Sequence, residues 1–510
     1  MPTRRQLDPE IMTVFFPEEG QSFKGLNKFS NLSRWVIDDH EFDDLINFIP
    51  MGRLIQQVPA NSSNFATLAA TAVWISAQPL NQATYIFALC TNGAIYQVSL
   101  GGTITTVTGP GTVSVNTDIA NWQGTTILFT DPNAAKIYSW NGTAFATVFS
   151  SQPEQFITVY AGRLWMANLS TIVFTNSGTF NSLGGDSGSF IITDSDCPPP
   201  IRALYPYGGN LYVFGYSWVK IYGGLYDSGS PPVLQFQSST LTDEAGLINK
   251  WGVLPFGYSV FYPSLYGVWN LLGSQPVLMS DPVDQFFLNA NVANSSYSAA
   301  YGVVLGDPCL MWHLQHGIDS TYRVLCMKYN PNGPSEWFTV SQGNITFITY
   351  GVNQATGQQL VWGTDTAGNL FQLFSSASTL VSSTVNTKLW SFGTRIREKS
   401  IGRAGIEMVV TGGAIVTLNA VNENLISTAP LLQSLNPSIN FIWSNNNQTF
   451  NWNNSGPFTW QAGGTQYALL DFDLPIQVRK LGLNVTVQAA GATIDSFGVE
   501  FTELPADWGA

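Results

Sequence analysis

The sequence predicts an all-β protein: a β-propeller followed by a C-terminal antiparallel β-sandwich-like domain, with a short N-terminal arm. Three observations lead to this prediction. Short strands rich in aromatic and β-branched residues recur along most of the chain, and turns containing Gly, Asn, Asp or Ser join them. The strand units repeat roughly every 35 to 55 residues, which is the period of propeller blades. Patterns typical of helices are scarce; the best candidate is the short segment SDPVDQFFLNANV.

Residues 1–55 are predicted to form the N-terminal arm or docking segment. They contain the most charged stretch of the chain, VIDDHEFDDLINF, in which five carboxylates lie among apolar side chains. This pattern is compatible with a short amphipathic helix or with a solvated loop. The segment is either an ordinary solvated surface or an arm that docks on a neighbouring subunit.

Residues 56–375 are predicted to form the propeller. Asn92-Gly93 and Asp131-Pro132-Asn133 each separate two apolar strands, which is typical of β-hairpins. A further hairpin unit recurs three times, with a turn followed by a short strand centred on Leu and an aromatic residue: Ala161-Gly162 before Leu164-Trp165, Gly208-Gly209 before Leu211-Tyr212, and Pro263-Ser264 before Leu265-Tyr266. The units correspond to six or seven blades, and their number stays open because strands from both ends of a propeller often share one blade.

A Ser/Thr-rich linker, residues 375–386, is expected to end the propeller. Residues 387–510 then alternate apolar and polar side chains, which predicts the sandwich-like domain. This domain opens with the one basic cluster of the chain: Arg395, Arg397, Lys399 and Arg403. We expect the cluster to make inter-subunit or inter-domain contacts; a solvated face and a nucleic-acid contact are the alternatives.

The composition and charge of the chain restrict the classes of function that it can have. Of 510 residues, 13% are aromatic and only 10% are charged, against about 25% charged in typical soluble domains. The net charge is −13, and each section of the chain is acidic. Tight DNA binding is disfavoured because it requires clustered cations, whereas an acidic surface lets DNA slide past. The sequence has no signal peptide and no long apolar run, so we expect synthesis in a cytoplasm and no membrane span.

The search for catalytic chemistry gives no convincing constellation. GDSGS lacks a histidine partner, and His313 and His316 are more typical of hydrogen-bonded residues than of metal ligands. The four cysteines are expected to be free, buried thiols. A propeller glycosidase would need paired carboxylates in its central funnel. The candidates are Asp186, Asp194, Asp196, Asp243, Glu244 and Asp365. We predict no enzymatic activity, no cofactor and no metal.

Several segments, in their order along the chain, resemble the tail-hub or nozzle proteins of short-tailed bacteriophages, a group that includes the packaged-DNA stabilisation proteins. The resemblance covers most of residues 120–510, and the order of the segments is more specific than any one of them. The segments are VYAGRLWMAN with TIVFTNSGTFN, IRALYPYGGNLYVFGYSWVKIYGG, EAGLINKWGVLPFGYSVFYPSLYGVWNL, VLMSDPVDQFF, LCMKYNPNGPSEWFTV and LWSFGTRIREK.

The resemblance implies a structural virion protein of the phage tail, assembled as a homohexameric ring below the portal and its adaptor protein. The ring would retain the packaged DNA and serve as its exit channel without gripping the genome. Its partners would be further copies of the chain, the portal adaptor and tail fibres. The alternative from another functional class is a propeller that binds or cleaves glycans of the host surface.

Overall fold

A computed structural model describes most of the 510 residues and divides them into two compact units. The unit called here the propeller unit comprises Asn61–Tyr329 and Gly343–Leu373. The sandwich unit comprises Met1–Ala60, Asn330–Gln342 and Phe374–Ala510. The described residues are 11–29, 33–107, 111–229, 233–272, 275–288, 297–315, 322–331, 333–376, 379–393, 397–435, 440–442, 444–445, 448–449, 459–461 and 465–504. Among them, no helix is long and apolar enough to cross a bilayer.

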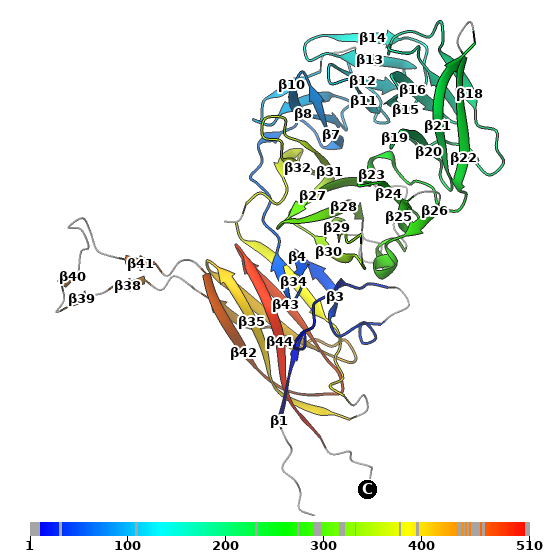
Figure 1. Ribbon diagram of the computed structural model, residues 1–510. Helices are drawn as coiled ribbons and strands as arrows, with labels where there is room; N and C mark the ends of the chain where they lie inside the picture. The colour runs from blue at the N-terminus through cyan, green and yellow to red at the C-terminus, as the bar shows by residue number, and fades with distance from the viewer. Residues whose placement is uncertain are drawn as a thin grey trace, which may run out of the picture. The chain divides into compact units, whose positions relative to one another are not determined.

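The propeller unit has seven blades within the described residues, each an antiparallel meander (Figure 1). The first strand of each meander lies at one edge of its sheet. Blades one to three are β7 (Ala72–Leu80), β8 (Ala83–Cys90), β9 (Ile95–Ser99) and β10 (Ile104–Thr106); β11 (Ile119–Trp122), β12 (Thr126–Asp131), β13 (Lys136–Trp140) and β14 (Phe145–Phe149); and β15 (Phe156–Tyr160), β16 (Arg163–Asn168), β17 (Thr171–Phe174) and β18 (Gly188–Ile191).

The remaining blades follow in chain order. They are β19 (Ala203–Tyr207), β20 (Asn210–Phe214), β21 (Val219–Ser228) and β22 (Val233–Thr242); β23 (Leu254–Phe256), β24 (Ser259–Ser264), β25 (Gly267–Leu272) and β26 (Gln275–Leu278); β27 (Ser298–Val304), β28 (Asp307–Gln315) and β29 (Tyr322–Lys328); and β31 (Ile345–Val352), β32 (Gln359–Asp365) and β33 (Asn369–Gln372), completed by β6 (Ala66–Thr67). Two 3-10 helices, η1 (Lys250–Gly252) and η2 (Asp281–Phe286), lie between blades.

Strands from both ends of the propeller segment close the ring. β6 pairs with β33 through Thr67 opposite Asn369 and Ala66 opposite Leu370. The first inner strand, β7, also contacts the last one, β31. The expected propeller is confirmed, and its last blade is shared between the two ends of the segment.

Polar contacts between the third, fourth and fifth blades repeat one pattern. The Tyr160 hydroxyl, at the end of β15, donates to the Gly209 carbonyl oxygen at 2.6 Å. The Tyr207 hydroxyl, at the end of β19, donates in the same way to the Gly257 carbonyl oxygen. Both glycines have a positive φ, 79° and 62°, and lie in the first hairpin turn of the next blade. The turn glycine therefore exposes a carbonyl that fixes the preceding blade.

One of the three predicted hairpin units is displaced. Gly162 and Gly209 turn as expected, with Leu164 and Leu211 fully buried behind them. In the third unit, however, the first hairpin turn is at Gly257, and Leu265 and Tyr266 connect β24 to β25. Tyr266 is 65% exposed, so this residue does not form the centre of a buried strand.

The sandwich unit contains two sheets. One has the order β4 (Phe48–Met51), β5 (Leu54–Gln57), β44 (Ala492–Glu503), β35 (Lys399–Thr411) and β42 (Thr465–Val478), with β1 (Ile11–Phe16) paired to β44. The other sheet has the order β30 (Glu336–Val340), β3 (Glu41–Ile46), β34 (Val381–Thr387), β43 (Leu481–Ala489), β36 (Ala414–Asn422) and β37 (Leu431–Leu435), with β2 (Gly25–Leu26) paired to β3. Short pairs join β38 (Asn440–Ile442) to β41 (Thr459–Gln461) and β39 (Ser444–Asn445) to β40 (Gln448–Thr449).

The structure corrects two expectations about domain boundaries. The described strands of residues 1–55 do not form a separate arm, because β3 pairs with β34 and β5 pairs with β44. Within the charged stretch, Glu41–Ile46 form strand β3 because Phe42 and Leu45 are buried, whereas residues 36–40 before the strand form turns that are largely exposed; neither part is a helix. The expected linker, residues 375–386, contains most of β34, whose alternate residues are buried.

Asn47 joins three separate segments of the sandwich unit. This residue is 1% exposed and has a positive φ of 60°. Its side-chain amide donates to the carbonyl oxygens of Ser341 and Ser382 at 3.0 and 2.8 Å, and its side-chain oxygen accepts from the Ser341 amide at 2.9 Å. A buried polar side chain with all of these bonds satisfied fixes the geometry of the segments around it.

Candidate functional site

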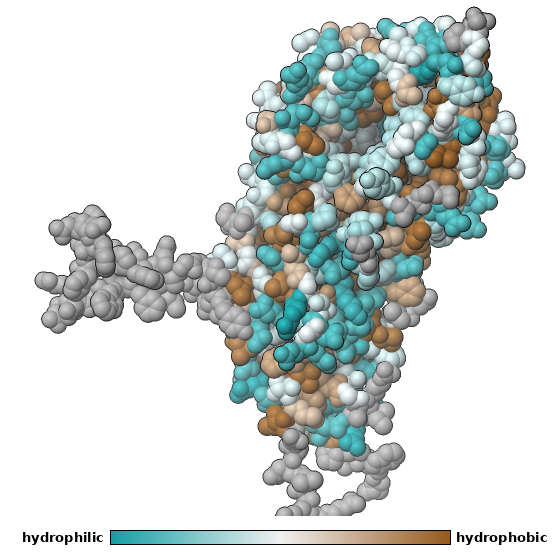
Figure 2. Space-filling view, viewed as in Figure 1, coloured by the Kyte–Doolittle hydropathy of each residue, from teal (hydrophilic) through white to brown (hydrophobic). Residues whose placement is uncertain are grey.

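The inner strands of the propeller surround two cavities on the propeller axis, where the surface is hollowed (Figure 2). The first, called here the start-side cavity, has a volume of about 390 Å³ and lies where these strands begin; Val73, Thr117 and Gln155 line it. The second, the end-side cavity, has a volume of about 480 Å³ and lies further along the same strands; Ala77, Asn121 and Val159 line it. Since Lys250 and Trp251 line both cavities, helix η1 lies between them.

Aromatic contacts hold Trp251 on the axis. Its ring stacks on Trp74 with 5.1 Å between ring centroids, and it meets Phe347 edge-on at 5.8 Å. The indole nitrogen of Trp74 donates to the Thr117 carbonyl oxygen at 2.8 Å, so the supporting ring is fixed as well. The Asn249 side chain caps η1 by accepting from the Trp251 backbone amide at 3.1 Å. The ring of Trp251 is therefore held in one position by packing on both of its sides.

A buried ion pair fixes the other residue of this helix. The Lys250 ammonium contacts the Asp118 carboxylate and also donates to the Ile157 carbonyl oxygen at 3.0 Å. The Asp118 side chain is 4% exposed, and the Lys250 side chain is 13% exposed. Asp118 also accepts from the backbone amides of Ile119 and Ile157, at 2.8 and 2.9 Å. One carboxylate therefore connects β11, β15 and η1.

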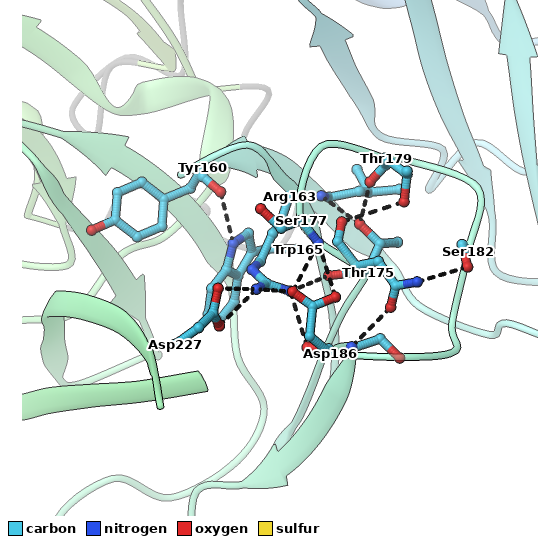
Figure 3. Close-up of polar contacts among 12 residues, drawn as sticks. Tyr160, Arg163, Trp165, Thr175, Ser177, Thr179, Ser182, Asp186 and Asp227 are labelled. Carbon is cyan, nitrogen blue, oxygen red and sulfur yellow. Dashed lines mark hydrogen bonds and ion pairs between the residues drawn. The ribbon is translucent and has the colours of Figure 1, made fainter. Parts of the chain in front are cut away.

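A second buried charge, Arg163, lies between the third and fourth blades (Figure 3). Its guanidinium donates to the Thr175 carbonyl oxygen at 2.9 Å, to the Asp186 carboxylate at 2.6 Å and to the Asp227 carboxylate at 2.9 Å. Arg163 is 2% exposed. Desolvation raises the pKa of Asp186, but the hydrogen bond and positive charge of Arg163 outweigh it, so this pKa lies below its usual value. Both carboxylates are thus used to hold the arginine.

None of the carboxylates proposed for a glycosidase lines either axial cavity within the described residues. Asp194 pairs with Lys220, and Asp365 accepts from backbone amides of its own turn. Asp196, Asp243 and Glu244 are exposed. The carboxylate that does line an axial cavity, Asp118, was missed. Its signal in the sequence was indirect: Lys250 is an isolated cation between apolar segments, and a buried cation requires an acidic partner.

The predicted basic cluster lies in the sandwich unit, and Arg395 falls outside the described residues. Arg397 pairs with Glu503 at 3.0 Å, and Arg403 pairs with Asp471 at 3.1 Å. Lys399 is fully buried and donates to the Arg397 carbonyl oxygen at 3.0 Å; burial lowers the pKa of its ammonium. These three cations therefore make polar contacts within their own unit.

The cysteines and His313, which the sequence analysis considered, occupy buried positions. All four cysteines are buried free thiols, as expected. His313 is fully buried and bonds to the Ile345 carbonyl oxygen at 2.9 Å, whereas His316 lies outside the described residues. Within the described part of the chain, no group of three or more His, Cys, Asp or Glu side chains is arranged to hold a metal ion.

Comparison with known proteins does not identify a family or a function for the chain. No family model and no curated protein matches the chain. Among solved structures, the chain is similar to virginiamycin B lyase from Staphylococcus aureus (11% identity, TM-score 0.41, 62% of this chain and 98% of that one). It is also similar to BBS1N in complex with ARL6DN (12%, 0.42, 62% and 97%) and to YCF48 bound to D1 peptide (10%, 0.39, 63% and 100%). Likenesses this weak imply nothing about the function of the chain.

Replacing Lys250 by alanine should destabilise the propeller by about 3–5 kcal/mol, because the buried Asp118 carboxylate loses its cation. Lys250→Arg keeps the charge and should cost less. Lys136→Ala, a lysine outside the axis, is the matched control and should change stability little. Urea unfolding followed by tryptophan fluorescence measures all three. If Lys250→Ala and Lys136→Ala lower the free energy of unfolding by equally small amounts, the axial ion pair does not stabilise the fold.

Asp186→Asn should lower the stability of the propeller by about 2 kcal/mol at pH 7, because Arg163 loses one of its two carboxylates. The folded pKa of Asp186 lies below its unfolded value of about 3.9, so this contribution is complete above that value. It is lost as the pH falls through the folded pKa. In thermal unfolding from pH 7 to pH 3, the difference in Tm between wild type and Asp186→Asn should therefore narrow below about pH 4. The exposed Asp243→Asn is the control. A difference in Tm between wild type and Asp186→Asn that stays constant down to pH 3 would refute this role of Asp186.

Proposed function

We propose that the chain is the subunit of a ring-shaped tail nozzle of a short-tailed bacteriophage. In this role it is a structural virion protein without catalytic activity. Six copies lie below the portal and its adaptor, retain the packaged genome and surround its exit channel. The observation that carries the proposal is the occupied propeller axis, in which Lys250 and Trp251 take the place that an open funnel would need.

The filled axis determines where DNA could pass. The major groove of a duplex is itself about 12 Å wide, so a duplex does not fit through an axis that holds a fixed tryptophan ring. The DNA channel of the proposed nozzle must therefore lie between copies of the chain. Each propeller then serves as a rigid part of the channel wall.

The charges of the chain support a wall that does not grip the genome. The net charge is −13, and DNA phosphates bind clustered, accessible cations. In the described structure, Arg163, Lys250, Arg397 and Arg403 all contact carboxylates of the same chain. Each of these cations is paired with a carboxylate, and the excess of acidic residues in the chain favours a surface along which the genome slides.

The mass of the purified full-length protein tests the proposal. Native mass spectrometry should give a species of six copies, and a gel-shift assay at moderate salt should show no shift of duplex DNA, because the surface is acidic. A monomer at every concentration, combined with release of sugar from host polysaccharide, would replace the nozzle by the glycan-cleaving alternative. Tight DNA binding at moderate salt would disprove the sliding surface.

A further inference from the structure

The end-side cavity has the dimensions of a small-molecule site. Its volume of about 480 Å³ falls within the range of roughly 300–1,000 Å³ that is usual for ligand pockets. The inner strands around it lie at the edges of their sheets, so backbone amides and carbonyls without a partner strand face the axis. Such a lining offers hydrogen bonds in many directions. The ordered Trp251 ring closes the inner end of the cavity.

Aromatic side chains give the cavity apolar faces. Tyr205 and Tyr350 line it together with Trp251. The Tyr301 ring packs on the Tyr350 ring, with 4.7 Å between the two ring centroids. Burial raises the pKa of the Tyr205 and Tyr350 hydroxyls above the usual value, and the two phenols are hydrogen-bonded to each other. Each phenol oxygen can still accept a hydrogen bond from a ligand, and the proton that the pair does not share can be donated. A ligand in contact with them can pack an apolar face on a ring and direct a hydroxyl to a phenol.

Thr158 contributes a polar side chain to the lining of the cavity. It is 8% exposed and lies on strand β15. Thr349 lies on β31 in the same lining; its hydroxyl oxygen accepts from the Ala77 amide at 3.2 Å, which leaves its proton to donate. Two hydroxyls are thus available to a bound group.

The electrostatics of the cavity favour an uncharged ligand. Lys250 is the one charged side chain among the described residues that line it. Its ammonium is neutralised by Asp118 and also bonded to the Ile157 carbonyl oxygen. An anion would find no unpaired cation in this lining, and a cation would find no carboxylate. A neutral molecule with many hydroxyls meets neither problem.

We propose that the end-side cavity binds a neutral sugar residue. A pyranose ring has an apolar C–H face for Tyr205, Tyr350 or Trp251 and hydroxyls for Thr158, Thr349 and the backbone groups of the inner strands. The site binds the sugar without cleaving it, because the described lining of this cavity contains no carboxylate to act as acid or nucleophile. This binding does not depend on the assembly of the chain into a ring.

Saturation-transfer NMR on the full-length protein tests the site with glucose, galactose, mannose and N-acetylglucosamine as probes. At least one should bind, with a Kd of about 1 mM, and glucuronic acid should bind more weakly than glucose because its carboxylate meets no cation. Thr158→Val preserves the shape of the side chain and removes its hydroxyl, so it should weaken binding about fivefold. Tyr350→Phe should weaken it by a similar factor.

Thr147→Val, on the outer strand β14, is the matched control and should leave binding unchanged. The thermal unfolding midpoint of each variant establishes that it folds. Binding that is the same in Thr158→Val, Tyr350→Phe and the control would place the sugar elsewhere and overturn the proposal. The absence of saturation transfer to all four neutral probes would overturn it as well, as would tighter binding of glucuronic acid than of glucose.

Discussion

The buried contact between Lys250 and Asp118 is the constraint on which the arrangement of the propeller axis depends. Charges removed from water must be paired, and this pair also uses the Ile157 carbonyl oxygen and the Ile119 amide. The segment between the fourth and fifth blades therefore crosses the axis and does not remain on the rim. Trp251 follows Lys250 directly, so the same contact places an aromatic ring on Trp74. Lys250 and Trp251 line both the start-side cavity and the end-side cavity of the described axis.

This arrangement connects the fold to both proposals. The propeller is stiffened at several points. Lys250 and Trp251 lie on its axis, β6 closes the ring on β33, and Arg163 joins the third and fourth blades. A rigid unit of this kind is suited to form part of a channel wall together with other copies of the chain. The same filled axis provides the end-side cavity with a floor, because Trp251 closes it. One local ion pair thus favours a structural role for the whole unit and a binding role for one of its ends.

The parts that could be predicted from the sequence were the local ones. The hairpin at Asn92-Gly93 was correct because a positive φ at Gly93 is encoded in two adjacent residues. Strands β3 and β34 were missed because they pair with each other across more than 300 residues of sequence, which no local pattern shows. Asp118 was missed for the same reason, since Lys250 lies 132 positions from it. Asp186 was identified as a notable carboxylate, but its partner Arg163 makes it structural and not a candidate acid for glycan cleavage.

An electron cryomicroscopy map of the assembled full-length protein would show where the pore of the ring lies. We expect continuous density for Trp251 on the axis of every propeller, and a single pore on the symmetry axis of the ring, between the copies. A pore wide enough for duplex DNA that runs through the propellers themselves, with Lys250 and Trp251 displaced from the axis, would contradict this expectation.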